Sequence, residues 1–116
     1  MSRFKILLID DDEISLMILE NALECEGHEI ITTSDSMVAT ELFEQHRPDI
    51  VILDVFMPNK DGLEVIKEIR AISTEVFIIA ISATEHYLRT AENFGASRGI
   101  LKENMPDDIV DAIKVL

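Results

Sequence analysis

Acidic side chains stand at the ends of two apolar stretches, where they could do chemistry. Residues 50–53 form a continuous apolar run rich in β-branched side chains, and Asp54 follows directly. Such a run is typical of a strand buried on both faces of a parallel sheet. Ligands bind at the carboxyl ends of the strands in open sheets of this kind. Asp54 is therefore the first candidate, and Asp10 and Asp11 follow an earlier apolar run in the same way.

Carboxylates gathered in this way need a cation. Two like charges about 5 Å apart repel by about 3 kcal/mol at an effective dielectric constant near 20. Hard oxygen ligands select Mg²⁺ or Mn²⁺ rather than Zn²⁺, which prefers His and Cys. A carboxylate beside such an ion can act as a nucleophile and form an aspartyl phosphate. Phosphoryl transfer then depends on positioning and charge neutralisation, and Ser82 and Lys102 stand after two further apolar runs to supply both.

Five alternations of apolar runs and helical patterns would position these residues, with no linker or repeat between them. The predicted strands cover residues 4–9, 30–33, 50–54, 75–81 and 98–101. Five βα units imply an α/β fold with a five-stranded parallel sheet and helices on both faces. The common flavodoxin-like order of such a sheet is 2-1-3-4-5. That order sets the ends of the first and third strands side by side, and so brings Asp10, Asp11 and Asp54 together.

Apolar spacing and end signals define the predicted helices. They are residues 13–26, a helix capped by Ser34 or Asp35, a helix after Asp61-Gly62, residues 84–94, and a last helix with Pro106 in its first turn. We expect three of them to face the core with these side chains: Ile14, Ile18, Ala22 and Leu23; Leu88, Ala91 and Phe94; and Ile109, Ala112, Ile113 and Leu116. Leu16 and Met17 widen the apolar surface of the first helix, either as ordinary variation or as a docking face for a phosphodonor.

Composition bounds the class of protein. The chain has 116 residues, which favours a single domain over residues 1–116. A formal net charge of −13 argues against binding nucleic acid or an anionic membrane, because phosphate recognition needs clustered Lys and Arg. Cys25 is the only cysteine and cannot form an internal disulfide, which favours a cytoplasmic location. No stretch has the length of a transmembrane helix or the pattern of a signal peptide.

Four separated motifs resemble the response-regulator receiver domain of two-component systems, including the chemotaxis-type regulators. They are Asp10-Asp11, Asp54-x-x-Met57-Pro58-x-x-Asp61-Gly62, Ser82-Ala83, and Gly95-Ala96-Ser97 followed by Lys102. The resemblance covers essentially the whole chain. It implies that Asp54 is the phosphoacceptor, that Asp10, Asp11 and the backbone carbonyl of Phe56 complete a Mg²⁺ site with Asp54, and that Ser82 and Lys102 contact the phosphoryl group. Asp12 is left out of the ligand set, because its position in the family points away from the metal.

The resemblance also implies a function. Asp54 would take a phosphoryl group from a phosphohistidine on a sensor histidine kinase or a histidine phosphotransfer protein. The protein would catalyse only its own phosphorylation and slow dephosphorylation, and would act on an output domain, a partner or a second copy of itself. The final helix stops a few residues short of the usual length, which favours a domain of a longer protein, with a single-domain relay as the alternative.

Three positions depart from the family pattern. Gly99 stands where the last strand commonly carries Tyr or Phe, and Glu103 stands where a cis-proline follows the lysine. We expect a trans Lys102-Glu103 bond, because a non-proline cis bond costs about 2.5–4 kcal/mol. The bulk of Phe56 could shield the phosphoryl group from water. We predict switching through Ser82 and its loop without an aromatic rotation, with Tyr87 as a possible substitute for the missing ring.

The sequence offers two alternative functions, and it disfavours the second. Gly99 and Glu103 motivate a degenerate receiver that docks partners without phosphorylation. A phosphatase that forms an aspartyl phosphate would need a second acid two residues after the nucleophile, and Phe56 stands there instead.

Overall fold

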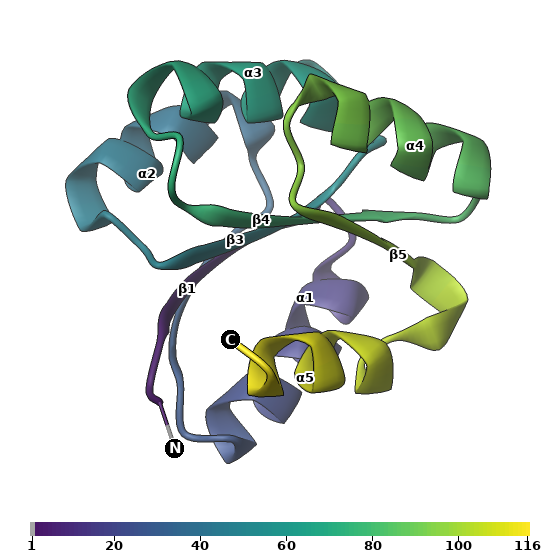
Figure 1. Ribbon diagram of the computed structural model, residues 1–116. Coiled ribbons are helices and arrows are strands. Elements are labelled where there is room, and N and C mark those ends of the chain that lie inside the picture. The colour runs from purple at the N-terminus through teal and green to yellow at the C-terminus, as the bar shows by residue number, and fades with distance from the viewer. Residues whose placement is uncertain (1) are drawn as a thin grey trace.

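A five-stranded parallel sheet forms the centre of the protein, with helices on both faces (Figure 1). The computed structural model describes residues 2–116. The strand order β2-β1-β3-β4-β5 confirms the flavodoxin-like order predicted from the sequence. The strands are β1 Lys5–Ile9, β2 Glu29–Thr33, β3 Ile50–Asp54, β4 Phe77–Ser82 and β5 Arg98–Leu101. The helices are α1 Glu13–Cys25, α2 Ala39–His46, α3 Gly62–Ile72, α4 Glu85–Phe94 and α5 Asp107–Lys114.

Two apolar cores flank the sheet. Helices α2, α3 and α4 cover one face, and α1 and α5 cover the other (Figure 1). In β3, Val51 and Leu53 join the core with α2, α3 and α4, whereas Ile50 and Ile52 join the core with α1 and α5. All five residues of β3 are buried, as a central strand of a doubly covered sheet requires. None of the described helices is long and apolar enough to cross a membrane.

The register of the sheet decides which polar residues meet. Strand β1 pairs with β3 so that Ile9 lies beside Leu53. Asp10 comes directly after Ile9, and Asp54 ends β3 at the same edge of the sheet. Strand β3 pairs with β4 so that Asp54 lies beside Ile81, one residue before Ser82. Residues far apart in sequence therefore reach the carboxyl edge together.

Local end signals account for the element boundaries. The strand bounds differ from the predicted ones by at most two residues, whereas α2 begins at Ala39, later than a cap at Ser34 or Asp35 predicted. Asp35 caps a 3₁₀ turn, Ser36–Val38, before α2, and its side chain accepts a hydrogen bond from the backbone N–H of Met37. Gly27 lies directly beyond the end of α1 with a φ of +94°, a conformation that glycine adopts without a steric penalty. Gly95 ends α4 in a similar conformation.

The predicted core face of α1 is partly wrong. The buried residues are Ser15, Leu16, Leu19 and Leu23, whereas Ile14 and Ile18 are 68% and 43% exposed. Both sets recur at helical spacing, so periodicity alone could not choose between them. The start of the helix decides the rotation: the side chain of Asp12 accepts hydrogen bonds from the N–H of Ile14 and from the hydroxyl of Ser15.

Two other apolar side chains are more exposed than predicted. Leu88 and Ala91 of α4 are buried as expected, but Phe94 in its last turn is 40% exposed. The ring of Phe94 lies 5.7 Å from the ammonium of Lys67 on α3, which is a cation–π geometry. In α5 the predicted apolar side is buried, except that Leu116 lies beyond the helix end at Lys114 and is 46% exposed.

Candidate functional site

Three carboxylates meet at the carboxyl edge of the sheet. Asp10, Asp11 and Asp54 each offer an oxygen atom within 4.8 Å of the other two. Asp10 and Asp54 are buried, while Asp11 is exposed. The fold thus brings together the three acids that the strand order predicted.

Asp54 is held from two sides. Its Oδ1 accepts a hydrogen bond from the backbone N–H of Phe56 at 3.0 Å. Its Oδ2 accepts one from Nζ of Lys102, also at 3.0 Å, and the same ammonium lies 3.5 Å from Oδ2 of Asp10. Burial of the ammonium lowers the pKa of Lys102, but the hydrogen bond to Asp54 and the charge of Asp10 outweigh it and raise that pKa above its usual value. Lys102 is therefore a fixed positive charge between two acids.

Of the two buried carboxylates in this cluster, that of Asp10 is the one whose charge is less compensated by hydrogen bonds. Its Oδ1 accepts a hydrogen bond from the N–H of Asp12 at 2.9 Å. Its Oδ2 is buried and has no hydrogen-bond partner. Burial, with the charge of Asp54 added, outweighs the hydrogen bond from Asp12 and raises the pKa of Asp10 to about 6. A buried carboxylate oxygen that faces two other acids fits a hard divalent cation, which oxygen ligands bind best.

Ser82 and Phe56 lie at the same edge in different ways. Ser82 ends β4 and is buried, and its Oγ accepts a hydrogen bond from the N–H of Thr84 at 3.2 Å. The Phe56 group in contact with Asp54 is its backbone N–H, and its side chain is 53% exposed. Sequence reasoning missed this donor, because an amide hydrogen belongs to every residue except proline and carries no signal in the sequence.

Gly62 is a second residue that the sequence analysis underestimated. The sequence predicted only a turn at Asp61-Gly62 and gave no sign of a close backbone contact. A Cβ atom at this position would lie 2.4 Å from the carbonyl oxygen of Asp54 and 2.7 Å from Cα of Val55. The N–H of Gly62 donates to the carbonyl of Val55 at 2.8 Å. Helix α3, capped by Asp61, therefore begins in direct contact with the backbone of Asp54.

Side chains from α2, from the 3₁₀ turn before it and from α3 contact the loop after Asp54. Nζ of Lys60 lies 2.9 Å from Oε1 of Glu68, an oxygen that also accepts a hydrogen bond from the hydroxyl of Thr40. The hydroxyl of Ser36 donates to the carbonyl of Pro58 at 3.2 Å. These contacts limit the movement of the loop relative to the carboxylates.

The departures noted in the sequence have structural counterparts. At Gly99, a Cβ atom would lie 2.8 Å from Cβ of Leu88, so α4 occupies the space of any side chain on that position of β5. Across residues 2–116 the cis peptide bond is Met105–Pro106, which confirms the predicted trans bond between Lys102 and Glu103.

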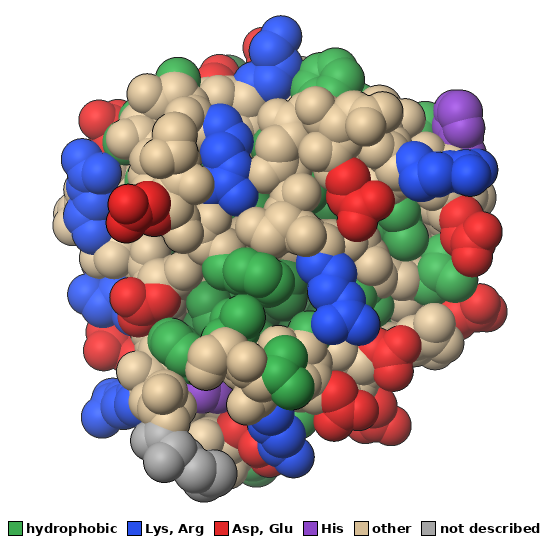
Figure 2. Space-filling view, in the orientation of Figure 1, with side chains coloured by type: hydrophobic (Ala, Val, Ile, Leu, Met, Phe, Trp, Pro, Cys, Tyr) green, Lys and Arg blue, Asp and Glu red, His purple; other side chains and the backbone are tan. Residues whose placement is uncertain are grey.

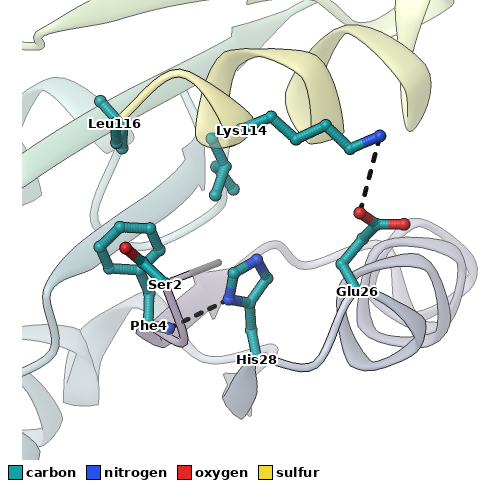
Figure 3. A pocket seen from close by; sticks show the side chains of 7 residues that line it. Ser2, Phe4, Glu26, His28, Lys114 and Leu116 are labelled. Atoms are coloured by element: carbon teal, nitrogen blue, oxygen red, sulfur yellow. Dashed lines mark hydrogen bonds and ion pairs between the residues drawn. The ribbon is translucent and has the colours of Figure 1, made fainter.

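A cavity of about 280 Å³ lies at the opposite edge of the sheet (Figure 3). It is lined by Ser2, Phe4, Glu26, His28, Ile113, Lys114 and Leu116. Its polar groups partner one another: the N–H of Phe4 donates to Nδ1 of His28 at 3.0 Å, and Nζ of Lys114 lies 3.7 Å from Glu26. The chemistry therefore belongs to the carboxylate cluster rather than to this cavity.

Comparison with known proteins agrees with this geometry. Residues 6–114 match the family model of the response regulator receiver domain. The chain belongs to this family. A curated relative of similar length is the chemotaxis protein CheY of Bacillus subtilis, 31% identical over 112 residues, which are 94% of this chain and 93% of CheY.

Two further comparisons extend the family relationship. The alkaline phosphatase synthesis transcriptional regulatory protein PhoP of Bacillus subtilis is 42% identical over 66 residues, which are 57% of this receiver and only 28% of PhoP. The crystal structure of the response regulator TrrA of Thermotoga maritima, in complex with Mg²⁺ and BeF, has a TM-score of 0.88 at 32% identity. That match covers 96% of each chain.

Proposed function

We propose that this receiver accepts a phosphoryl group on Asp54, in the presence of Mg²⁺, from a phosphohistidine of a two-component partner. The observation that carries the proposal is the environment of the Asp54 carboxylate. It is buried and held between the ammonium of Lys102 and an N–H group, and it lies beside Oδ2 of Asp10, which has no hydrogen-bond partner. The Mg²⁺ complex of TrrA supports the choice of ion.

The transfer would replace a P–N bond of the donor with a P–O bond to Asp54. A carboxylate oxygen of Asp54 attacks phosphorus, the P–N bond of the donor breaks, and the imidazole leaves with its electron pair. Lys102 offsets negative charge on the phosphoryl oxygens, and the Ser82 hydroxyl donates a hydrogen bond to one of them. Water later attacks phosphorus and the bond between phosphorus and the Asp54 oxygen breaks. Inorganic phosphate leaves, a proton of the water passes to solvent, and the Asp54 carboxylate is restored. The protein is thus its own substrate rather than an enzyme with turnover on others.

The donor set for the metal is Asp10, Asp11, Asp54 and the carbonyl of Phe56. The ion supplies neutralisation of phosphoryl charge when bound. Asp10 contributes the most clearly available oxygen, because its Oδ2 has no hydrogen-bond partner.

We propose the exposed side of α1 as the docking face for the phosphodonor, a histidine kinase or a histidine phosphotransfer protein. Helix α1 begins directly after the acidic run, and Ile14, Met17 and Ile18 are exposed on it. Leu16, which the sequence had placed on such a face, is buried instead. On the face of the molecule in Figure 2, cationic and acidic side chains are interspersed, so this face offers no continuous basic surface for nucleic acid.

The direct test is incubation with acetyl phosphate and Mg²⁺, followed by intact-mass spectrometry. The wild-type protein should gain one acid-stable, base-labile phosphate, and Asp54→Asn should gain none. A wild-type protein that remains unmodified after saturating acetyl phosphate would refute the proposal.

The filled space at Gly99 favours one alternative function, a receiver that docks partners without phosphorylation. In that case the affinity for a captured partner would be the same for the wild-type protein, its phosphorylated form and Asp54→Asn. A difference of tenfold or more between the phosphorylated and unmodified forms would exclude this alternative.

A further inference from the structure

We propose that the contact between the rings of Phe56 and Tyr87 transmits the state of Asp54 to helix α4. The inference rests on the proposed function, since it concerns the effect of Asp54 phosphorylation on the rest of the molecule. It assigns to two side chains of this protein the task of linking the acceptor loop to a helix that a partner can reach.

Phe56 contacts both the phosphoacceptor Asp54 and helix α4. Its backbone N–H donates to Oδ1 of Asp54 at 3.0 Å. Its ring meets the ring of Tyr87 on α4 edge-on, with centroids 4.2 Å apart and planes at 76°. Edge-to-face aromatic pairs at this separation are attractive beyond the area they bury. A rotation of the Phe56 backbone that re-aims its N–H therefore also moves a ring in contact with α4.

Strand β5 cannot transmit the state of Asp54 through a side-chain rotation at position 99. Gly99 has no side chain that could change its rotamer, and Leu88 of α4 fills the space beside it. Helix α4 therefore lies in van der Waals contact with β5 at this point, and Leu88 itself is buried. The neighbouring residue, Tyr87, is half-buried and faces the acceptor loop through Phe56.

The two ends of α4 are held differently. At its carboxyl end, Nε of Arg70 donates to the carbonyl of Gly95 at 2.8 Å, and the N–H of Ala96 bonds back to the carbonyl of Ala91. At its amino end, Thr84 is the cap residue and makes no side-chain hydrogen bond to the helix. The first turn, which carries Tyr87, is therefore the end with fewer constraints.

Phosphorylation would act on this contact through the Phe56 N–H. In an aspartyl phosphate, one carboxylate oxygen carries a phosphoryl group that has close to two negative charges and three strong acceptor oxygens. The N–H that now binds Oδ1 of Asp54 then has a stronger acceptor in reach. Since the Phe56 side chain is half-exposed, its ring can move with the backbone without displacing the core. The ring contact with Tyr87 changes as a result.

The chain provides its own probe for the test. Tyr87 is the only tyrosine, and there is no tryptophan, so the intrinsic fluorescence of the protein reports Tyr87 alone. Tyrosine emission is recorded during incubation with acetyl phosphate and Mg²⁺, and bound phosphate is measured by intact mass at each time. The emission should change in proportion to bound phosphate and should stay constant in Asp54→Asn.

Phe56→Ala is the decisive variant, and Phe94→Ala is its matched control at the other end of the same helix. Compared at equal phosphate occupancy, Phe56→Ala should show an emission change at least threefold smaller than the wild type, and Phe94→Ala should match the wild type. Phe56→Leu keeps apolar bulk without a ring and should show the same reduced emission change. It replaces the alanine variant if circular dichroism shows that Phe56→Ala is unfolded.

The outcomes separate the two proposals. A wild-type protein that takes no phosphate refutes the proposed function, and the inference with it. A protein that takes phosphate without a change in Tyr87 emission refutes the inference alone, as does a full response in Phe56→Leu.

Discussion

At the scale of single residues, the charge balance of the pocket depends on one ammonium group. Lys102 lies within 3.5 Å of oxygens from both Asp10 and Asp54, so a single positive charge faces two buried acids and the exposed Asp11. A second cation at this edge of the sheet would offset the remaining excess of negative charge. Burial is the largest cause of the raised pKa of Asp10, and the charge of Asp54 adds to it.

Asp10→Asn should stabilise the metal-free protein at pH 7 by roughly 1–3 kcal/mol, because the pKa of Asp10 rises from 3.8 to about 6 on folding and each unit is worth about 1.4 kcal/mol. A raised pKa means that the folded state binds more protons than the unfolded state between about pH 4 and 6. The wild type therefore loses stability as the pH rises through this window, and its difference from Asp10→Asn should nearly vanish at pH 4.

Urea unfolding at pH 4 and pH 7 in the presence of a chelator measures this difference. Asp111→Asn, which removes an exposed charge on α5, is the control and should show a much smaller effect at pH 7. A variant Asp10→Asn that is less stable than the wild type at pH 7 would contradict the prediction.

Side-chain chemistry at strand ends was predictable from the sequence, and backbone chemistry was not. Asp54 and Lys102 each come after a short apolar run, and parallel strands deliver their carboxyl ends to one edge. The Phe56 N–H and the close approach at Gly62 depend on the path of one loop, to within tenths of an ångström. No pattern of residue types encodes such a path directly.

At the scale of elements, two helices owe their positions to contacts that periodicity does not reveal. In α1, the hydrogen bonds between Asp12 and the next turn rotate Leu16 and Leu19 inward and leave Ile14 exposed. In α3, the missing side chain at Gly62 lets the helix start against the backbone of Asp54. Hydrophobic spacing predicted that both helices exist. Hydrogen bonds at the amino end of α1 and close backbone contact at the amino end of α3 set the orientation and position of these helices.

Gly62→Ala should destabilise the protein by about 1–3 kcal/mol, because the added methyl group would overlap backbone atoms that cannot move aside cheaply. The sign is informative. Helix propensity alone would make alanine better than glycine by up to about 1 kcal/mol. Chemical denaturation measures the change, and Glu64→Ala on the exposed side of α3 should stay within about 0.5 kcal/mol of the wild type. A stabilised Gly62→Ala would show that α3 is free to shift away from Asp54.

At the scale of the whole molecule, the alternation of runs and helical patterns was enough to predict the fold. Strands β1, β3 and β4 are buried almost throughout, and their sequences are therefore nearly continuous apolar runs. Because crossover connections between parallel strands are right-handed, few topologies are open to five βα units. The register that sets Ile9 beside Leu53 then joins the site to the sheet as a whole. Binding at the carboxylates should therefore stabilise the entire fold.

Mg²⁺ at ten times its dissociation constant should stabilise the protein by about 1.4 kcal/mol, a rise of several degrees in Tm for a domain of this size. The ion binds the folded state, where three acids converge, and finds no such cluster in the unfolded chain. Thermal unfolding should be compared with potassium chloride at equal ionic strength, since a net charge of −13 makes any salt stabilising through screening. Asp10→Asn should lose most of the Mg²⁺-specific part, whereas Asp111→Asn should keep it. Equal stabilisation by Mg²⁺ and potassium chloride would mean that the carboxylates of the wild-type protein do not act as a divalent site.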